Sequence, residues 1–247
     1  YRSTYGGVAY SGSNSTSNPL FTNAGSNDYT LQSTSPAIGA GNSDAIAYDF
    51  NDIYRPQGTN KDIGAYEYRN TWTGGSSTED WGTTGNWDQG YEPNVNTESP
   101  IIANATPYPV ISSDDGASND GNVLLEDITI NSGAELTINA DASLKLVGDF
   151  TNNSGTVKLN SDNLNFASII VQGTATGNIT YNRFVNIADM AGEKWDLIGS
   201  PVDGLSISSF VSTNTESPAT LATNGVQYAV GVYNNSNNDW SNYTSDG

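Results

Sequence analysis

The pattern of apolar and polar positions is clearest between Asn122 and Tyr181, where apolar residues alternate with polar ones in short runs. Alternation over so few residues is the period-2 signature of half-buried β-strands. Groups rich in Asn, Asp, Ser and Gly separate the runs and favour tight turns. The pattern predicts short strands with inward-facing pairs at Ile128/Ile130, Leu136/Ile138, Leu144/Leu146, Val157/Leu159, Leu164/Phe166, Ile169/Val171 and Ile179/Tyr181.

The same stretch contains an internal repeat. Asp127–Gly133 returns 22 positions later as Asp149–Gly155, with Asp, Thr, Asn, Ser and Gly at the same offsets. A second short strand follows each copy, at residues 135–139 and 157–160. Short strands, tight turns and this repeat favour a β-solenoid, in which each coil stacks on the coil before it. An antiparallel sandwich is the alternative, but it gives no reason for a near-identical copy.

Composition supports the same fold class. Hydrophobic residues make up 35% of the 247 residues and charged residues 14%, so solubility rests on Asn, Ser, Thr and Gly. These residues favour turns and strands over helices, and the one helical candidate is short, at residues 186–194. We predict an all-β chain that forms one large domain or two smaller ones.

The charge balance limits the partners. The chain has 27 acidic and 8 basic residues, which gives a net charge of −19. This charge repels polyanions, so no nucleic acid partner and no binding to anionic membrane surfaces are expected. No apolar run approaches the roughly 18 residues that span a bilayer, so no membrane insertion is expected.

An acidic surface can attract Ca²⁺, and the loop at residues 114–121 is the candidate site. Its ligands would be Asp114, Asp115 and Asp120, because Ca²⁺ binds several carboxylate and carbonyl oxygens and glycine lets the chain wrap around it. The spacing fits neither the EF-hand nor the RTX nonapeptide. An unliganded surface loop is therefore favoured over a Ca²⁺ site, and no other cofactor is indicated.

The chain contains no Cys and no His. Disulfides, thiolate nucleophiles, Cys/His zinc sites and His-dependent triads are therefore excluded. No catalytic residues are predicted, and we expect no enzymatic activity from this chain. Absence of Cys fits a bacterial exported protein. Tyr1 begins in the middle of a pattern without a signal peptide, so we interpret the chain as a piece of a longer exported protein.

Residues 1–70 carry four ordered motifs: NPLF from Asn18, DYTLQSTSPAIGAG from Asp28, D-x-x-D-x-x-RP from Asp49 and DIGAYEY from Asp62. Together they resemble the closing segment of right-handed parallel β-helix proteins of the pectate-lyase-like superfamily. The resemblance implies a cap on the C-terminal end of a preceding solenoid, where Pro and Gly end strand stacking.

Five charged residues of this cap, Asp49, Asp52, Arg55, Asp62 and Glu67, suggest either a structural network or a site. We favour a structural ion pair of Arg55 over a catalytic carboxylate pair. In the family that the cap resembles, catalytic residues lie in central coils, which this chain does not contain.

Residues 71–121 are rich in aromatic residues, with Trp72, Trp81, Trp87 and Tyr91 close together. Exposed aromatic rings could bind carbohydrate by stacking on sugar rings, whereas buried ones would cover the start of the solenoid with each indole N–H hydrogen-bonded. We favour the buried arrangement. The motif WTG…W…GNW…P, with the later RFV and WDLIGSPV, resembles a module of large secreted proteins of the Bacteroidetes. Those proteins typically leave the cell through the type IX secretion system, and in them the later motifs begin a β-sandwich-like part.

We therefore divide the chain into a β-helix coil and cap (1–70), a Trp-rich opening plus short β-solenoid (71–181) and the start of a β-sandwich-like domain (182–247). The leading hypothesis is a non-catalytic segment of a large secreted or cell-surface protein, adhesin-like, with a spacer or display role and secretion or surface-attachment proteins as partners. The alternative is a carbohydrate-binding accessory region of a β-helix polysaccharide lyase or glycoside hydrolase, with glycans as ligands.

Overall fold

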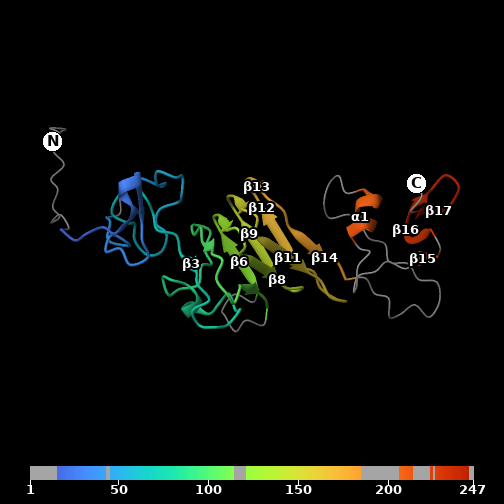
Figure 1. Ribbon diagram of the computed structural model, residues 1–247, viewed down its shortest axis with the longest axis horizontal. Helices are drawn as coiled ribbons and strands as arrows, with labels where there is room; N and C mark the ends of the chain where they lie inside the picture. Colours follow the sequence, from blue (N-terminus) through green and yellow to red (C-terminus); the bar gives the residue numbers. More distant parts are fainter. Residues whose placement is uncertain are drawn as a thin grey trace. The chain divides into compact units, whose positions relative to one another are not determined.

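The computed structural model describes residues 16–42, 45–113, 121–184, 206–213, 223–224 and 226–244. The chain forms two compact units, residues 1–186 and 187–247. Strands and irregular segments make up most of the described residues, which confirms the predicted all-β class (Figure 1). The division at 70/71 and 181/182 stays a prediction.

The first unit is built around three sheets whose strands all run parallel. Their strands are β3 (Thr71–Trp72), β4 (Ile101–Ile102), β5 (Val110–Ile111), β6 (Asn122–Leu125), β7 (Ile128–Ile130), β8 (Glu135–Ile138), β9 (Ser143–Leu146), β10 (Phe150–Asn152), β11 (Thr156–Asn160), β12 (Ser168–Val171), β13 (Ala175–Thr176) and β14 (Thr180–Asn182).

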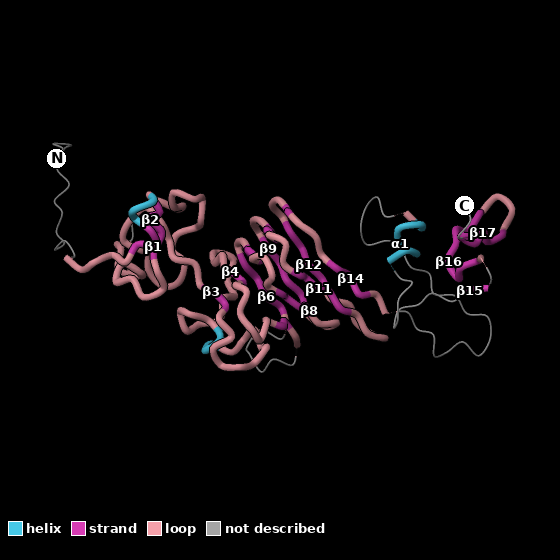
Figure 2. Tube along the Cα trace, viewed as in Figure 1, coloured by secondary structure: helices cyan, strands magenta, loops and turns pink. Residues whose placement is uncertain are grey.

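The chain visits the three sheets in a fixed rotation. The sheets have the strand orders β13-β10-β7-β4-β3, β14-β11-β8-β5 and β12-β9-β6. Strands from β4 to β14 fall into these sheets in the sequence first, second, third and then first again. Figure 2 shows strands of this region side by side, among them β6, β9 and β12. Each pass of the chain therefore adds one strand to the edge of every sheet.

The sequence repeat and the strand register coincide. β7 and β10 pair with Ile128 opposite Phe150 and Thr129 opposite Thr151, which is the 22-residue offset of the repeat. β8 and β11 also pair in parallel, with Leu136 opposite Val157, an offset of 21 residues. Repeated residues thus lie next to each other in space, because one repeat is the number of residues that the chain needs to return to the same sheet.

Buried side chains from the three sheets form one apolar core. The predicted pairs on β7, β8, β9 and β11 are buried, and the pairs Ile169/Val171 and Ile179/Tyr181 are half-buried and pack against the core. Side chains between these pairs point outward, as the alternation predicts. Six of the pairs were therefore placed on the core side by sequence alone.

The pair Leu164/Phe166 was predicted wrongly. These residues lie in a turn between β11 and β12, and Leu164 is 77% exposed. The carboxylate of Asp162 accepts hydrogen bonds from the backbone N–H of Leu164 and of Asn165, both at 2.7 Å. This local turn competes with strand formation, and a period-2 pattern does not reveal it.

Residues 16–70, which are called the cap below after the resemblance that they carry, contain little regular structure. β1 (Phe21–Asn23) and β2 (Asp28–Leu31) form an antiparallel hairpin around a short 3-10 turn, Ala24–Ser26. A second 3-10 turn, Thr84–Asn86, lies in the Trp-rich segment.

The described part of the second unit contains α1 (Ile207–Thr213), β15 (Thr223–Asn224), β16 (Gln227–Asn234) and β17 (Asp239–Thr244). The strands form an antiparallel sheet in the order β15-β16-β17. Sequence reasoning missed α1, although Ser206 caps it by accepting the Ser209 N–H. The predicted helix at residues 186–194 lies outside the described residues. Within the described part, no helix has the length and apolar character to cross a bilayer.

Candidate functional site

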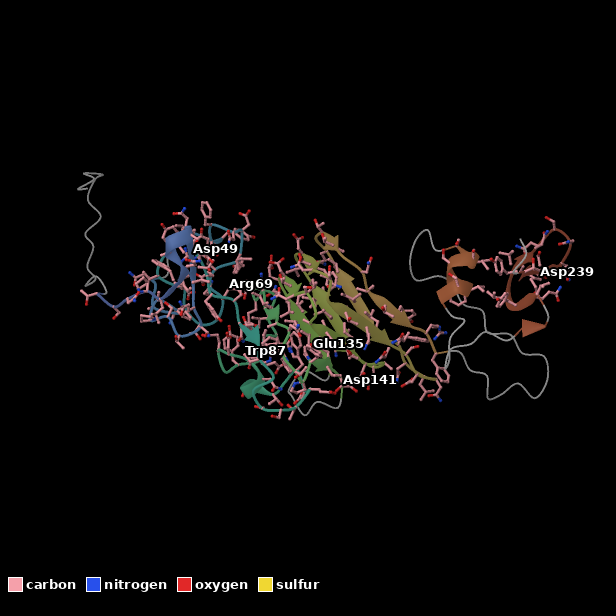
Figure 3. All side chains as sticks on the ribbon, in the orientation of Figure 1. Asp49, Arg69, Trp87, Glu135, Asp141 and Asp239 are labelled. Atoms are coloured by element: carbon pink, nitrogen blue, oxygen red, sulfur yellow. The ribbon has the colours of Figure 1, made fainter. Side chains whose placement is uncertain are left out.

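The three tryptophans of residues 71–91 form a buried cluster at the first strands of the sheets. Trp72, Trp81 and Trp87 are between 0% and 2% exposed. Trp87 lies between the other two, with its ring centroid 5.2 Å from that of Trp72 and 4.8 Å from that of Trp81. Both pairs are close to perpendicular, the edge-to-face arrangement that aromatic quadrupoles favour. Figure 3 marks Trp87 within this crowded region.

Each indole N–H of the cluster has a backbone acceptor. Trp72 donates to the carbonyl of Pro107 at 2.8 Å, Trp81 to that of Pro93 at 3.1 Å and Trp87 to that of Trp81 at 2.9 Å. A sugar ring would need an exposed aromatic face, and these three indoles offer none. The exposed platform required by the carbohydrate-binding interpretation is therefore not formed by them, and the buried alternative describes their geometry.

Tyr91, the fourth aromatic candidate, is half-buried against the cap. A Cβ at Gly58 would lie 3.2 Å from the Tyr91 hydroxyl oxygen, so the ring packs where glycine leaves room. Burial, with the carboxylates of Glu98 and Asp88 nearby, raises the pKa of Tyr91. Tyr91 thus lies between the cap and the Trp-rich segment.

The cap is held by a buried ion pair, as predicted for Arg55. Its Nε lies 2.6 Å from Oε1 of Glu67, and the two side chains are 8% and 0% exposed. Glu67 also accepts the backbone N–H groups of Asp62 at 2.9 Å and Gln57 at 3.0 Å. The charges are paired and the remaining lone pairs satisfied, which a buried carboxylate requires.

Two other acidic residues of the cap, Asp49 and Asp62, also accept hydrogen bonds from the backbone. Asp49 accepts the N–H of Glu67 at 2.8 Å. Asp62 accepts those of Gly39 at 2.7 Å and Tyr68 at 2.6 Å. Burial raises the pKa of Asp62 to about 6, against the effect of these two hydrogen bonds. Asp52 has a left-handed backbone with φ of 60° and is exposed. The network ties loops together and uses its carboxylates as backbone acceptors.

Gln57 and Arg69 join the cap to the segment before β4 and to β7, and sequence reasoning missed both. The Gln57 side chain donates to the carbonyl of Thr97 at 2.9 Å and accepts the N–H of Ser99 at 2.8 Å. Arg69 donates to the carbonyls of Ser99 and Pro100 and, at 2.9 Å, to the hydroxyl of Thr129 on β7.

Burial lowers the pKa of Arg69 to about 10, although Asp127 and Asp49 oppose this shift. The five hydrogen bonds of Gln57 and Arg69 described above fix the boundary between the cap and the chain that follows. The sequence feature that could have identified Arg69 is its position directly after DIGAYEY, in a chain with few basic residues.

The calcium prediction is not resolved by these contacts. Asp114, Asp115 and Asp120 lie outside the described residues, so this site stays a prediction. Across the described ranges, no three acidic side chains gather closely enough to hold a metal ion.

Comparison with protein families adds one relationship. The model of a family described as a Domain of unknown function (DUF8693) matches residues 71–246. This region contains the tryptophan cluster, the three sheets and the second unit, and it leaves out the cap. Searches of curated proteins and of solved structures returned no match.

Proposed function

The chain belongs to the family described as Domain of unknown function (DUF8693), and we propose that it is a stiff, non-catalytic spacer segment of a large secreted or cell-surface bacterial protein. Its role would be to hold other parts of that protein apart or to display them. The observation that carries the proposal is the rotation of the chain through three parallel sheets in register with its own sequence repeat.

This rotation supports a β-solenoid. Each strand bonds to the strand one pass earlier and one pass later, so every coil rests on its neighbours and the structure grows along one axis. Adjacent strands in such a sheet lie about 4.8 Å apart, so each coil adds about that length. A continuous apolar core and the hydrogen bonds between neighbouring strands resist bending, and a spacer needs this resistance.

The cap supports a longer architecture. Its four motifs resemble the end of a right-handed parallel β-helix, and the side chains of Gln57 and Arg69 attach it to the chain that follows. We infer a rod in which one solenoid ends at the cap and a second begins at the tryptophan cluster.

The cellular setting is inferred from motifs and composition. The WTG…GNW…P and WDLIGSPV motifs resemble modules of type IX secretion cargo in the Bacteroidetes. An acidic chain without Cys is also consistent with a bacterial exported protein. Secretion and surface-attachment proteins are the partners that this setting implies.

Stiffness can be tested with spin labels on introduced cysteines, because the chain has no native Cys. Labels at Asn23→Cys on the cap and Lys145→Cys on β9 should give one narrow distance distribution. The pair Lys145→Cys and Leu164→Cys, both outside the cap, gives the reference width. A distribution across the cap several times broader than this reference would contradict a stiff spacer.

The absence of catalysis needs a separate assay. The purified chain should release no reducing ends and no unsaturated products from polyuronates or neutral glycans during prolonged incubation. Sustained release that scales with protein concentration and is lost on heat denaturation would overturn the non-catalytic assignment.

A further inference from the structure

Residues 16–70 have an unusual distribution of polar and apolar side chains. Their buried side chains include Arg55, Lys61, Asp62 and Glu67, whereas several large apolar side chains are exposed. Phe50 is 75% exposed, and the other exposed apolar residues of this segment are Tyr29, Ile46, Tyr48 and Ile63. An exposed apolar group of this size on a polar-cored segment indicates a surface that something else covers.

Part of this surface forms an apolar groove. A cavity of about 310 Å³ is lined by residues that include Phe21, Tyr29, Leu31, Phe50, Ile63 and Tyr66. Two edge-to-face aromatic pairs shape its walls, Phe21 with Tyr29 at 5.4 Å and Phe50 with Tyr66 at 5.7 Å. None of the residues that line it is charged. The groove therefore suits an apolar occupant with few polar groups.

The chain reaches the groove along a fixed path. The hydroxyl of Ser35 donates to the carbonyl of Pro19 at 2.6 Å, and the N–H of Gln32 donates to that of Leu20 at 3.0 Å. Phe21, the next residue, lines the groove itself. Any chain that precedes residue 18 is therefore tethered next to the groove, at a high effective concentration.

Residues 1–15, which lie outside the described residues, have a suitable composition. They carry four large apolar or aromatic residues, Tyr1, Tyr5, Val8 and Tyr10, among small polar ones. Their single charged side chain is Arg2, and they contain no acidic residue, in a chain whose net charge is −19. Fifteen residues can extend over about 50 Å, so their reach is sufficient.

We propose that residues 1–15 dock their apolar side chains into the groove formed by Phe21, Tyr29, Phe50, Ile63 and Tyr66. The competing occupants are a preceding coil of the solenoid inferred above and a second copy of the chain. A preceding coil as the occupant would leave all three cysteine pairs at the rate of the control pair, and two copies of net charge −19 repel each other. A glycan is a poorer occupant, because sugar recognition needs several oriented polar groups and this groove is lined by apolar side chains.

Disulfide trapping tests the docking directly in the full chain. Tyr5→Cys, Val8→Cys and Tyr10→Cys are each combined with Phe50→Cys, and oxidation is followed on non-reducing gels and by mass spectrometry. A disulfide needs Cα atoms within about 7 Å, so a bond reports close approach. The matched control combines Val8→Cys with Lys145→Cys on the exposed face of β9.

Docking predicts that at least one pair with Phe50→Cys forms an intramolecular disulfide at least tenfold faster than the control pair. Bonds only between two chains would identify a second copy as the occupant and overturn the proposal. Rates equal to the control for all three pairs would overturn it as well.

A second measurement does not depend on cysteines. In the triple variant Tyr5→Ser, Val8→Ser and Tyr10→Ser, an apolar dye should bind the uncovered groove, with a fluorescence increase of several fold. Adding Phe50→Ser should remove most of this increase. Equal dye binding by the unaltered chain and the triple variant would contradict a covered groove.

Discussion

At the scale of single residues, the role of a side chain in this protein depends on its partners. Trp87 contacts two other indoles edge to face, and its N–H is fixed on the carbonyl of Trp81. Asp62 is a charged residue by type, yet burial raises its pKa to about 6 and its oxygens bond to Gly39 and Tyr68. Residue type alone would have made the first a sugar-binding candidate and the second a site candidate.

Replacing Trp87 should destabilise the start of the three sheets. Trp87→Ala removes two aromatic contacts and opens a cavity, and we expect a loss of about 3–5 kcal/mol in the free energy of unfolding. The control Trp87→Phe keeps an aromatic ring and loses the hydrogen bond to Trp81, so its loss should be clearly smaller. Denaturation followed by circular dichroism measures both, and equal losses would contradict a packing role for the indole.

Asp62 should give the cap a pH-dependent stability. Its pKa is raised to about 6 in the folded chain from an ordinary value of 3.8, because of burial. Above both values the folded state holds an unfavourably buried charge, and below both values the carboxyl is neutral in either state. The contribution of Asp62 to the free energy of unfolding therefore falls as the pH rises from about 4 to about 6.

The variant Asp62→Asn lacks this titration. The free energy of unfolding of the unaltered chain minus that of the variant should decrease as the pH rises from about 4 to about 6. The effect of the amide itself does not change with pH, so it does not alter this trend. Denaturation at several pH values measures the difference. A difference that stays constant with pH would contradict the raised pKa.

At the scale of elements, strands that are related by the repeat still differ in detail. Asn152 on β10 lies opposite Ile130 on β7. The buried amide of Asn152 accepts the Gly155 N–H at 2.7 Å and donates to the carbonyl of Asn178 at 2.7 Å. Asn152 therefore connects the turn after β10 to the chain at Asn178, one pass later. Isoleucine has no polar side-chain group that could make these hydrogen bonds.

Glycine at the turn between β10 and β11 is required by space. A Cβ at Gly155 would lie 2.6 Å from Cγ2 of Ile130 and 2.8 Å from the carbonyl oxygen of Asn131. Gly155→Ala should force the two passes apart and cost about 1–3 kcal/mol. The control Gly25→Ala has open space, since its nearest neighbour would be a side-chain oxygen at 3.7 Å.

Thermal unfolding compares the two glycine variants. We expect a clear fall in Tm for Gly155→Ala and almost none for Gly25→Ala. A similar Tm for both variants would mean that the close approach at Gly155 does not limit the packing of neighbouring strands.

At the scale of the molecule, the first unit combines two parts with different interiors. The apolar core lies wholly between Trp72 and Ala167, whereas residues 16–70 bury mainly polar and charged side chains. Gln57 and Arg69 connect the two parts through backbone carbonyls. The polar part therefore depends on the apolar part for much of its stability, because buried polar contacts contribute little net free energy.

Removing Arg69 should uncouple the two parts. Arg69→Met leaves the carbonyl of Pro100 and the hydroxyl of Thr129 without this donor. We expect at least tenfold faster hydrogen exchange at residues 45–68, with little change in β7 and β10. The control Arg183→Met removes a cation that lies 4.3 Å from the Phe166 ring centroid and should leave residues 45–68 unchanged. Uniform acceleration over the whole first unit would contradict local coupling.

The sequence by itself determined the strand class, the repeat and most of the core, because alternation and a 22-residue offset are local properties. It also predicted the pairing of Arg55, since an arginine among acids in a turn-rich segment has few other partners. The burial of Trp72, Trp81 and Trp87, the contacts of Arg69 and the groove beside Phe21 depend on residues that are distant in the chain. Only the tertiary structure brings those residues together, so only it decided which aromatic rings are covered and which remain open to a partner.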